Sequence, residues 1–401
     1  MIFSTPEREF LRLSAMSSPD WPAMITIART ALHYGELRRL ALLHQLDGVV
    51  AWRLLDDRMD GVAPNIVRDD CQRQLDNLAW ANGKWWAEAV DFCERLDAAG
   101  ISYTMRGGPA QYACLGIPAW PRSWSDIDLF VPITSEAAVQ KIAADMGGTY
   151  TRWFAAWWSV SLPSELRFDC EVCPNEEVSW DMFAGARDVS VLGATQHIPS
   201  AEAWVAHWAW NTWKTVSRHA TPLPLWALAR IKGVIDNASG WSWENFGALL
   251  RANIATIVAH ADMPASWRAE DVHERNVPAY YILQLLSIVD RVYGLFPPDI
   301  TIGTLIAPHE LRTPPIITEG EYRVHDQPYE MQFRLLEWGT WPGDEAFLFD
   351  YYERTGTQAR LAAGLWRETG KHDKAGVSYD PVQHRNVVRA HPDQSEKPDA
   401  S

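Results

Sequence analysis

Gly100-Ile-Ser-Tyr-Thr-Met-Arg-Gly-Gly-Pro109 and, further along, Asp126-Ile-Asp-Leu-Phe-Val131 are the two segments from which the architecture can be read. Residues 101–105 alternate like a short strand and run into two glycines. Pro109 suits the first position of a helix over 110–115, because its missing N–H is not needed there. Asp126–Val131 has the apolar character of a buried strand and ends at Pro132. The sequence therefore predicts a strand, a glycine turn, a short helix and a second strand.

Outward from this unit, the pattern predicts a small sheet between two helical regions. Thr134 or Ser135 is expected to cap a helix that ends at Met146, and strands are expected at 149–154, 157–162 and 166–172. Helical periodicity is found at 31–55, 69–99, 200–216, 223–237, 243–261, 278–293 and 343–369. The expected fold class is mixed α+β. The expected units are a helical region 1–100, a core 101–198, a helical region packing on it 199–296, a wrapping segment and helix 297–370, and a disordered tail 371–401.

Composition limits the function classes. The chain has 401 residues, with 51 acidic against 36 basic residues and a formal charge of −15. Such a field disfavours nucleic acid as a partner but permits a nucleoside triphosphate whose charge a divalent cation reduces. Five cysteines, the lack of a signal-peptide pattern and the lack of a long apolar run predict a cytoplasmic protein without a membrane span. Cys170 and Cys173 have the spacing of half a zinc site, but buried strand thiols are the favoured interpretation.

The paired acids Asp126 and Asp128 carry the chemical hypothesis. Alternate residues of a strand face the same side, so both carboxylates point one way while Ile127 and Leu129 face the core. Two adjacent carboxylates repel each other unless a cation lies between them or one is protonated. Oxygen ligands of this kind suit Mg²⁺. A solvated strand end is the alternative interpretation of the pair taken alone.

Three neighbouring features favour a metal and phosphate site. Glycines at the turn allow backbone N–H groups to approach phosphates closely. A third carboxylate on a later strand would complete the metal-binding set, and Asp169 is favoured over its rival Glu171. Arginines near the turn and the paired acids are candidate phosphate donors, with charge balance as the alternative role. The candidate metal ligands and catalytic residues are Asp126, Asp128 and Asp169, and the candidate nucleotide-binding residues are Arg106, Gly107, Gly108 and Arg122.

The segment from Gly100 to Val131 resembles a poorly characterised bacterial nucleotidyltransferase family of the DNA polymerase β-like superfamily. The resemblance extends over roughly residues 20 to 290, including the helix around His44-Gln-Leu-Asp-Gly and the rear helix that begins at Pro199-Ser-Ala-Glu. It implies a small mixed-sheet nucleotidyltransferase core with N- and C-terminal helical regions, and the same acids and glycines as site residues. Arg106 stands where the family usually has lysine, Gly108 where serine is common, and Glu171 where histidine often follows.

The resemblance and the residues together predict an enzyme that uses Mg²⁺ or Mn²⁺ and a nucleoside triphosphate. It would transfer a nucleoside monophosphate, most plausibly AMP, to a hydroxyl or related group of a small molecule or peptide. The resemblance implies natural-product biosynthesis as one setting. Alternatives are a protein-nucleotidylating toxin or regulator, a metal-dependent glycosyltransferase that uses Asp-x-Asp, and a non-catalytic nucleotide-binding scaffold.

The rear helix carries several aromatic and polar residues with two possible roles. Four of the 22 tryptophans lie on it, and packing is favoured over stacking on a base or an aromatic acceptor. They are Trp204, Trp208, Trp210 and Trp213. His207 and Asn211 are four residues apart and share a helix face. A place in the helix interface is favoured for this pair over a place at the acceptor pocket.

Overall fold

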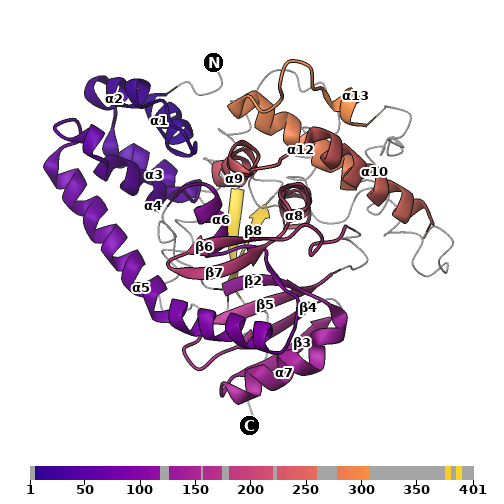
Figure 1. Ribbon diagram of the computed structural model, residues 1–401. Coiled ribbons are helices and arrows are strands. Elements are labelled where there is room, and N and C mark those ends of the chain that lie inside the picture. The colour runs from indigo at the N-terminus through magenta and orange to yellow at the C-terminus, as the bar shows by residue number, and fades with distance from the viewer. Residues whose placement is uncertain are drawn as a thin grey trace, which may run out of the picture.

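A computed structural model describes residues 5–117, 126–154, 157–173, 180–219, 224–259, 278–306, 375–380 and 385–390. It has a small sheet with a helical group at either side, seen in indigo and in orange in Figure 1. The mixed α+β class expected from the sequence is confirmed. No helix in the described residues is long and apolar enough to cross a membrane.

The central sheet has five strands in the order β1-β2-β5-β4-β3. The strands are β1 (Thr104–Met105), β2 (Asp126–Val131), β3 (Thr149–Phe154), β4 (Trp157–Ser161) and β5 (Arg167–Val172). β2 and β5 pair in parallel, and the other neighbouring pairs are antiparallel. The chain returns from β2 through helix α7 (Glu136–Asp145) and the β3–β4 hairpin, so two strands distant in sequence lie side by side.

The two faces of this sheet meet different helices. Phe168 of β5 stacks on Phe92 of helix α5 (Asn65–Ala98), with ring centroids 4.2 Å apart. On the opposite face, Phe130 of β2 meets His207 of helix α8 (Ala201–His219) edge to face at 4.7 Å. Because side chains alternate along a strand, the acids of β2 lie on the face that α8 approaches.

The front helices form a bundle that rests on α5. They are α1 (Pro6–Ser14), α2 (Trp21–Thr30), α3 (Tyr34–Leu43), α4 (Asp47–Leu55) and a 3₁₀ turn over Asp57–Met59. The single periodic stretch expected over 31–55 is two helices, because Gln45 adopts a left-handed φ of 59°. α5 begins at Asn65, earlier than the periodicity indicated. It ends as expected at Gly100, whose φ of +69° accompanies a hydrogen bond from Ile101 N to Leu96 O.

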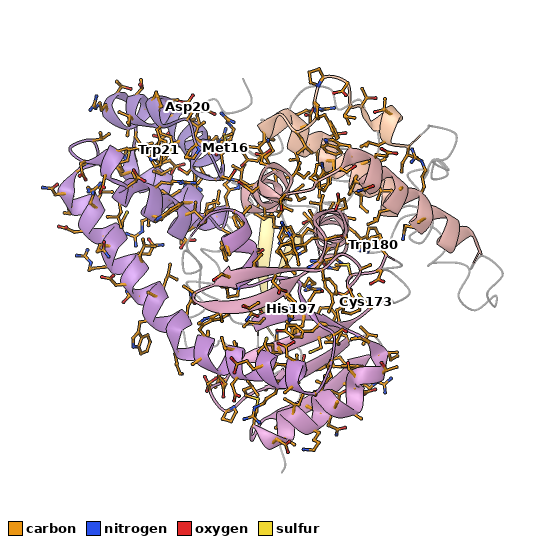
Figure 2. All side chains as sticks on the ribbon, viewed as in Figure 1. Met16, Asp20, Trp21, Cys173, Trp180 and His197 are labelled. Carbon is orange, nitrogen blue, oxygen red and sulfur yellow. The ribbon has the colours of Figure 1, made fainter. Side chains whose placement is uncertain are left out.

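The rear helices match their periodicities closely. They are α8, α9 (Leu225–Asn237), α10 (Trp243–Ala259), α12 (Pro278–Tyr293) and the short α13 (Ile302–Leu305). The backbone N–H of Leu225 donates to His44 Nδ1 at 3.1 Å, which joins the rear helices to the front bundle. Side chains fill the space between these helices and the sheet (Figure 2).

A second sheet was not expected from the sequence. β6 (Arg187–Val191) and β7 (Ala194–Ile198) form an antiparallel hairpin that packs beside β1 and the six-residue helix α6 (Pro109–Cys114). Its turn contains Leu192 at φ 47° and Gly193 at φ 83°, the backbone signs of a tight hairpin turn. His197, labelled in Figure 2, lies on β7.

Several expected elements differ in the structure. The strand expected over 101–105 is limited to Thr104–Met105. Ser135 occupies the N-cap position of α7, as expected, but its side chain makes no capping hydrogen bond, because its hydroxyl donates to the Pro132 carbonyl at 2.6 Å. Two paired strands, β8 (Ala375–Asp380) and β9 (Arg385–Ala390), lie in the segment expected to be a disordered tail, where their β-branched valines favour strands. The helix expected over 343–369 lies outside the described residues.

Candidate active site

The candidate site lies on the sheet face that α8 approaches, and strand pairing sets its geometry. In the parallel register of β2 and β5, Asp126 lies opposite Arg167, Asp128 opposite Asp169, and Phe130 opposite Glu171. Residues opposite each other in register share a face, so acids from two strands gather there. The expectation that Asp169 faces the same side as Asp126 and Asp128 is therefore confirmed, and Asp169 is the direct neighbour of Asp128.

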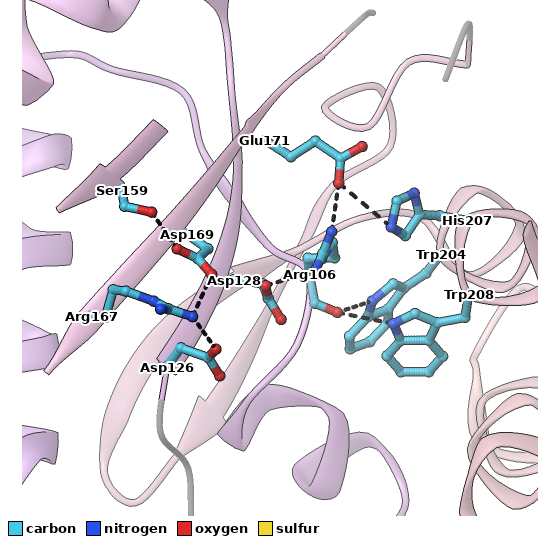
Figure 3. Close-up of polar contacts among 10 residues, drawn as sticks. All are labelled: Arg106, Asp126, Asp128, Ser159, Arg167, Asp169, Glu171, Trp204, His207 and Trp208. Carbon is cyan, nitrogen blue, oxygen red and sulfur yellow. Dashed lines mark hydrogen bonds and ion pairs between the residues drawn. The ribbon is translucent and has the colours of Figure 1, made fainter. Parts of the chain in front are cut away.

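One arginine holds the outer pair of carboxylates. Arg167 Nη2 lies 3.0 Å from Asp126 Oδ2 and 3.0 Å from Asp169 Oδ2 (Figure 3). The other oxygen of Asp169, Oδ1, accepts a hydrogen bond of 2.6 Å from the Ser159 hydroxyl on β4. Ser159 Oγ in turn accepts from the indole N–H of Trp153 at 2.9 Å. Asp169 is thus held by Arg167 of its own strand and by Ser159 of β4, which together fix its orientation.

A second arginine holds the inner pair. Arg106 donates to Asp128 Oδ1 at 2.7 Å and to Glu171 Oε2 at 2.6 Å, and its guanidinium lies 5.1 Å from the ring centroid of Trp157. Burial alone would lower the pKa of Arg106, but the carboxylates of Asp128 and Glu171 raise it, so the side chain stays charged. Burial also raises the pKa of Asp128, and nearby Asp126 adds to this effect. The positive charge of Arg106 opposes this rise in the pKa of Asp128, and a further cation beside Asp128 would act in the same direction.

The glycine turn lies directly against Asp128. A Cβ atom on Gly107 would lie 2.8 Å from Asp128 Oδ2, so only glycine leaves the carboxylate in place. Gly108 has φ 69° and ψ −146°, a conformation that is almost exclusive to glycine. α6, which follows, spans only six residues, so the turn offers backbone N–H groups and space rather than the field of a long helix.

Two tryptophans of α8 fix the backbone at the start of this turn. The indole N–H groups of Trp204 and Trp208 both donate to the carbonyl oxygen of Arg106, at 2.7 and 3.0 Å (Figure 3). Both side chains are buried. Packing was the favoured role for these residues, and the structure adds hydrogen bonds that orient the Arg106–Gly107 peptide. Trp210 is also buried, whereas the side chain of Trp213 lies outside the described residues.

The remaining sequence candidates have these positions. Arg122 belongs to 118–125, which the structure does not describe. Glu171 lies on the same sheet face as Asp169, two residues further along β5. It stands between Arg106 and His207, and its Oε2 atom is 3.8 Å from His207 Nε2. His207 is buried in the interface of α8 and the sheet, the place favoured for it. Cys170 and Cys173 are buried free thiols, and burial raises the pKa of both.

Sequence reasoning did not identify Arg167 or Ser159 as parts of the site. Arg167 was detectable in principle, because it precedes Asp169 by two residues on a strand and so must share its face. Ser159 carries no such signal, since its contact with Asp169 depends on the β4–β5 register. The roles of Trp204 and Trp208 depend on how α8 packs, which spacing along the helix does not encode.

The acid face carries oxygen donors of the kind that Mg²⁺ or Mn²⁺ binds. Asp126, Asp128 and Asp169 offer only carboxylate oxygens, which such cations prefer. Arg167 Nη2 already places a positive charge at 3.0 Å from two of them. Among the described residues, no three or more His, Cys, Asp or Glu side chains are arranged to hold a metal ion together. The acids therefore fit such a cation in chemistry, provided that Arg167 gives up its contacts.

Comparisons with known proteins give limited similarity. No protein-family profile matches the chain, and no curated protein matches it. The solution structure of the antibiotic-resistance factor ANT(2'')-Ia is 18% identical, with 43% of this chain and 97% of that chain covered and a TM-score of 0.33. The crystal structure of ANT(2'')-Ia in complex with adenylyl-2''-tobramycin is 18% identical, with 39% and 90% covered and a TM-score of 0.30. Similarity of this extent assigns no activity to the chain.

Proposed function

We propose that the protein is a nucleotidyltransferase that depends on Mg²⁺ or Mn²⁺. It transfers a nucleoside monophosphate, AMP from ATP in the first instance, to a hydroxyl or related group of a small molecule or peptide. The observation that carries the proposal is the pairing of Asp128 with Asp169, with Asp126 on the same face and Gly107 against Asp128. Carboxylates from two strands beside a glycine turn are what a metal-bound triphosphate requires.

The proposed reaction forms one bond and breaks one. The acceptor oxygen attacks the α-phosphorus, the bond from that phosphorus to the bridging oxygen breaks, and pyrophosphate leaves. A divalent cation held by Asp126, Asp128 and Asp169 would supply positive charge to the phosphate oxygens and the leaving group. The carboxylate of Asp169 takes the proton of the acceptor hydroxyl, and its hydrogen bond from Ser159 keeps it oriented for that role.

The nucleotide is proposed to lie at the glycine turn. Gly107 and Gly108 carry no side chain that would keep phosphate oxygens from the backbone N–H groups. Arg106 contributes positive charge at the same place and holds Asp128 at 2.7 Å. Arg122 remains a proposed phosphate donor on the basis of its sequence position. Nucleic acid is not proposed as a partner, because the net charge of −15 repels a polyphosphate chain.

The test is release of pyrophosphate from ATP, GTP, CTP and UTP with Mg²⁺ or Mn²⁺, with water or a panel of alcohols and amino alcohols as acceptor. Asp126→Asn, Asp128→Asn and Asp169→Asn keep the shape of each side chain and remove its charge. Each is expected to lower turnover by ~100-fold or more, because positioning and charge stabilisation are lost together. Asp91→Asn is the matched control, since this exposed carboxylate of α5 forms an ion pair with the surface Arg95.

The outcomes separate the proposal from its alternatives. Unchanged turnover in folded Asp126→Asn and Asp128→Asn variants would remove these residues from the mechanism. Transfer from a UDP-sugar, without pyrophosphate from any triphosphate, would indicate a glycosyltransferase instead. AMP adducts on co-expressed proteins, found by mass spectrometry in place of modified small molecules, would assign a protein acceptor.

A further inference from the structure

The two arginines of the acid face are held very differently. Arg106 is 12% exposed. Its guanidinium contacts Asp128 and lies over the ring of Trp157, and its carbonyl oxygen accepts a hydrogen bond from Trp204. Arg167 is the first residue of β5 and is 47% exposed, and its guanidinium contacts Asp126 and Asp169. An ion pair with one exposed partner is screened by solvent ions and is held less tightly than a buried one. Arg167 is thus the displaceable cation of the pair.

The position of the Arg167 guanidinium is also chemically specific. Its Nη2 atom is equidistant, at 3.0 Å, from one oxygen of Asp126 and one of Asp169, which are two of the three proposed metal ligands. A positive charge between two carboxylates relieves their repulsion in the same way as a divalent cation. The guanidinium and the metal therefore compete for the same carboxylates.

We propose that Arg167 is a built-in counter-ion that neutralises Asp126 and Asp169 in the metal-free protein and gives up these oxygens when the divalent cation binds. The proposal rests on the metal site of the proposed function. It implies that metal affinity is set lower than the carboxylates alone would give. It also implies that the metal-free protein depends on Arg167 for a stability that the metal can replace.

The experiment measures Mn²⁺ binding directly, by the electron paramagnetic resonance signal of free Mn²⁺ at low ionic strength, without nucleotide or turnover. Arg167→Gln removes the charge and is expected to bind Mn²⁺ roughly tenfold more tightly, because a nearby positive charge that competes for the ligands is lost. Arg167→Lys keeps the charge but loses the planar guanidinium, and its affinity for Mn²⁺ is expected to lie between those of the unmodified protein and Arg167→Gln. If Arg167 only shaped the site, Arg167→Gln would bind Mn²⁺ more weakly than the unmodified protein, because the site would be distorted.

Arg152→Gln is the matched control. Arg152 is 49% exposed, lies on the opposite face of the same sheet and pairs with Glu136 at 3.3 Å, so its loss changes the net charge equally. Its Mn²⁺ affinity is expected to stay close to that of the unmodified protein. Thermal unfolding gives a second readout: Arg167→Gln unfolds at a lower temperature than the unmodified protein without metal, and Mn²⁺ raises its unfolding temperature by more.

The possible results separate the two proposals. If the unmodified protein binds Mn²⁺ and Asp126→Asn weakens that binding, the metal site stands. Equal or weaker Mn²⁺ binding by Arg167→Gln would then overturn the counter-ion role alone. If the protein binds no Mn²⁺ that depends on Asp126, the counter-ion role and the metal site of the proposed function both fail.

Discussion

Gly107 and Gly108 of the glycine turn are expected to respond to substitution by alanine in opposite ways. In Gly107→Ala the new Cβ atom would lie 2.8 Å from Asp128 Oδ2, well inside contact distance. The φ of Gly107 lies outside the left-handed region, so the backbone accepts alanine and the carboxylate must move instead. Asp128 is 23% exposed and can turn toward solvent while Arg106 keeps its ion pair with Glu171, so the free energy of unfolding should fall by only about 1 kcal/mol. A displaced catalytic group typically costs ~100-fold in turnover.

Gly108→Ala is expected to reduce stability more than function. A Cβ atom there would meet Ile127 at an ordinary 3.7 Å, but φ is 69° and ψ is −146°. Holding alanine in that conformation costs about 1–3 kcal/mol. The free energy of unfolding should therefore fall more than in Gly107→Ala, while the molecules that remain folded keep Asp128 in place and retain their Mn²⁺ affinity.

Both variants are compared by urea unfolding, by Mn²⁺ affinity and by pyrophosphate release under conditions in which each is fully folded. The expected pattern is a stable but impaired Gly107→Ala and a destabilised but competent Gly108→Ala. The reasoning is refuted if Gly107→Ala binds Mn²⁺ and turns over like the unmodified protein. It is also refuted if Gly108→Ala unfolds at the same urea concentration as the unmodified protein.

Ser159→Ala removes the 2.6 Å hydrogen bond to Asp169 and should weaken Mn²⁺ binding, with about 1 kcal/mol lost from the free energy of unfolding; unchanged Mn²⁺ affinity would show that Asp169 is oriented without it. For His197, burial lowers the pKa, but the hydrogen bonds that the ring donates to Asp188 at 2.6 Å and to Asp97 at 3.1 Å outweigh burial and raise the pKa above its ordinary 6.5. The folded state then favours the protonated ring, so its stabilisation is full below the unfolded pKa and is lost as pH rises through the folded pKa. Urea unfolding between about pH 6 and 9 should show this decline, and His197→Gln should remove it; an equal decline in both proteins would assign it to other groups.

The sheet core was predictable because its strands carry local signals. The strand Asp126–Val131 has the bounds expected from its residues and from Pro132. Gly147, at φ +73°, follows the end of α7, as its position in the sequence indicated. The break in the front helix at Gln45 was not predictable, since a left-handed glutamine has no sequence signature. The β6–β7 hairpin was missed because polar residues make up most of both strands, and even a buried position is occupied by the polar Gln196.

The candidate site also combines features that the sequence predicts with features that it does not. The shared face of Asp126 and Asp128 follows from strand periodicity alone. That Asp169 lies opposite Asp128 depends on the parallel pairing of two strands separated by a helix and a hairpin. The hydrogen bond from Ser159 depends on a further register, between β4 and β5. Sequence spacing therefore identifies the acids, whereas the groups that orient them are determined by tertiary packing.

The two indoles that donate to the Arg106 carbonyl join the candidate active site to the helices behind it. That oxygen receives Trp204 and Trp208 from α8, at 2.7 and 3.0 Å, although α8 lies outside the 101–198 unit suggested by the sequence. A fragment cut at that boundary would leave the peptide ahead of Gly107 without its anchors. Any displacement of α8, by a ligand or a partner on the rear helices, would likewise be transmitted through one carbonyl group to the position of Asp128.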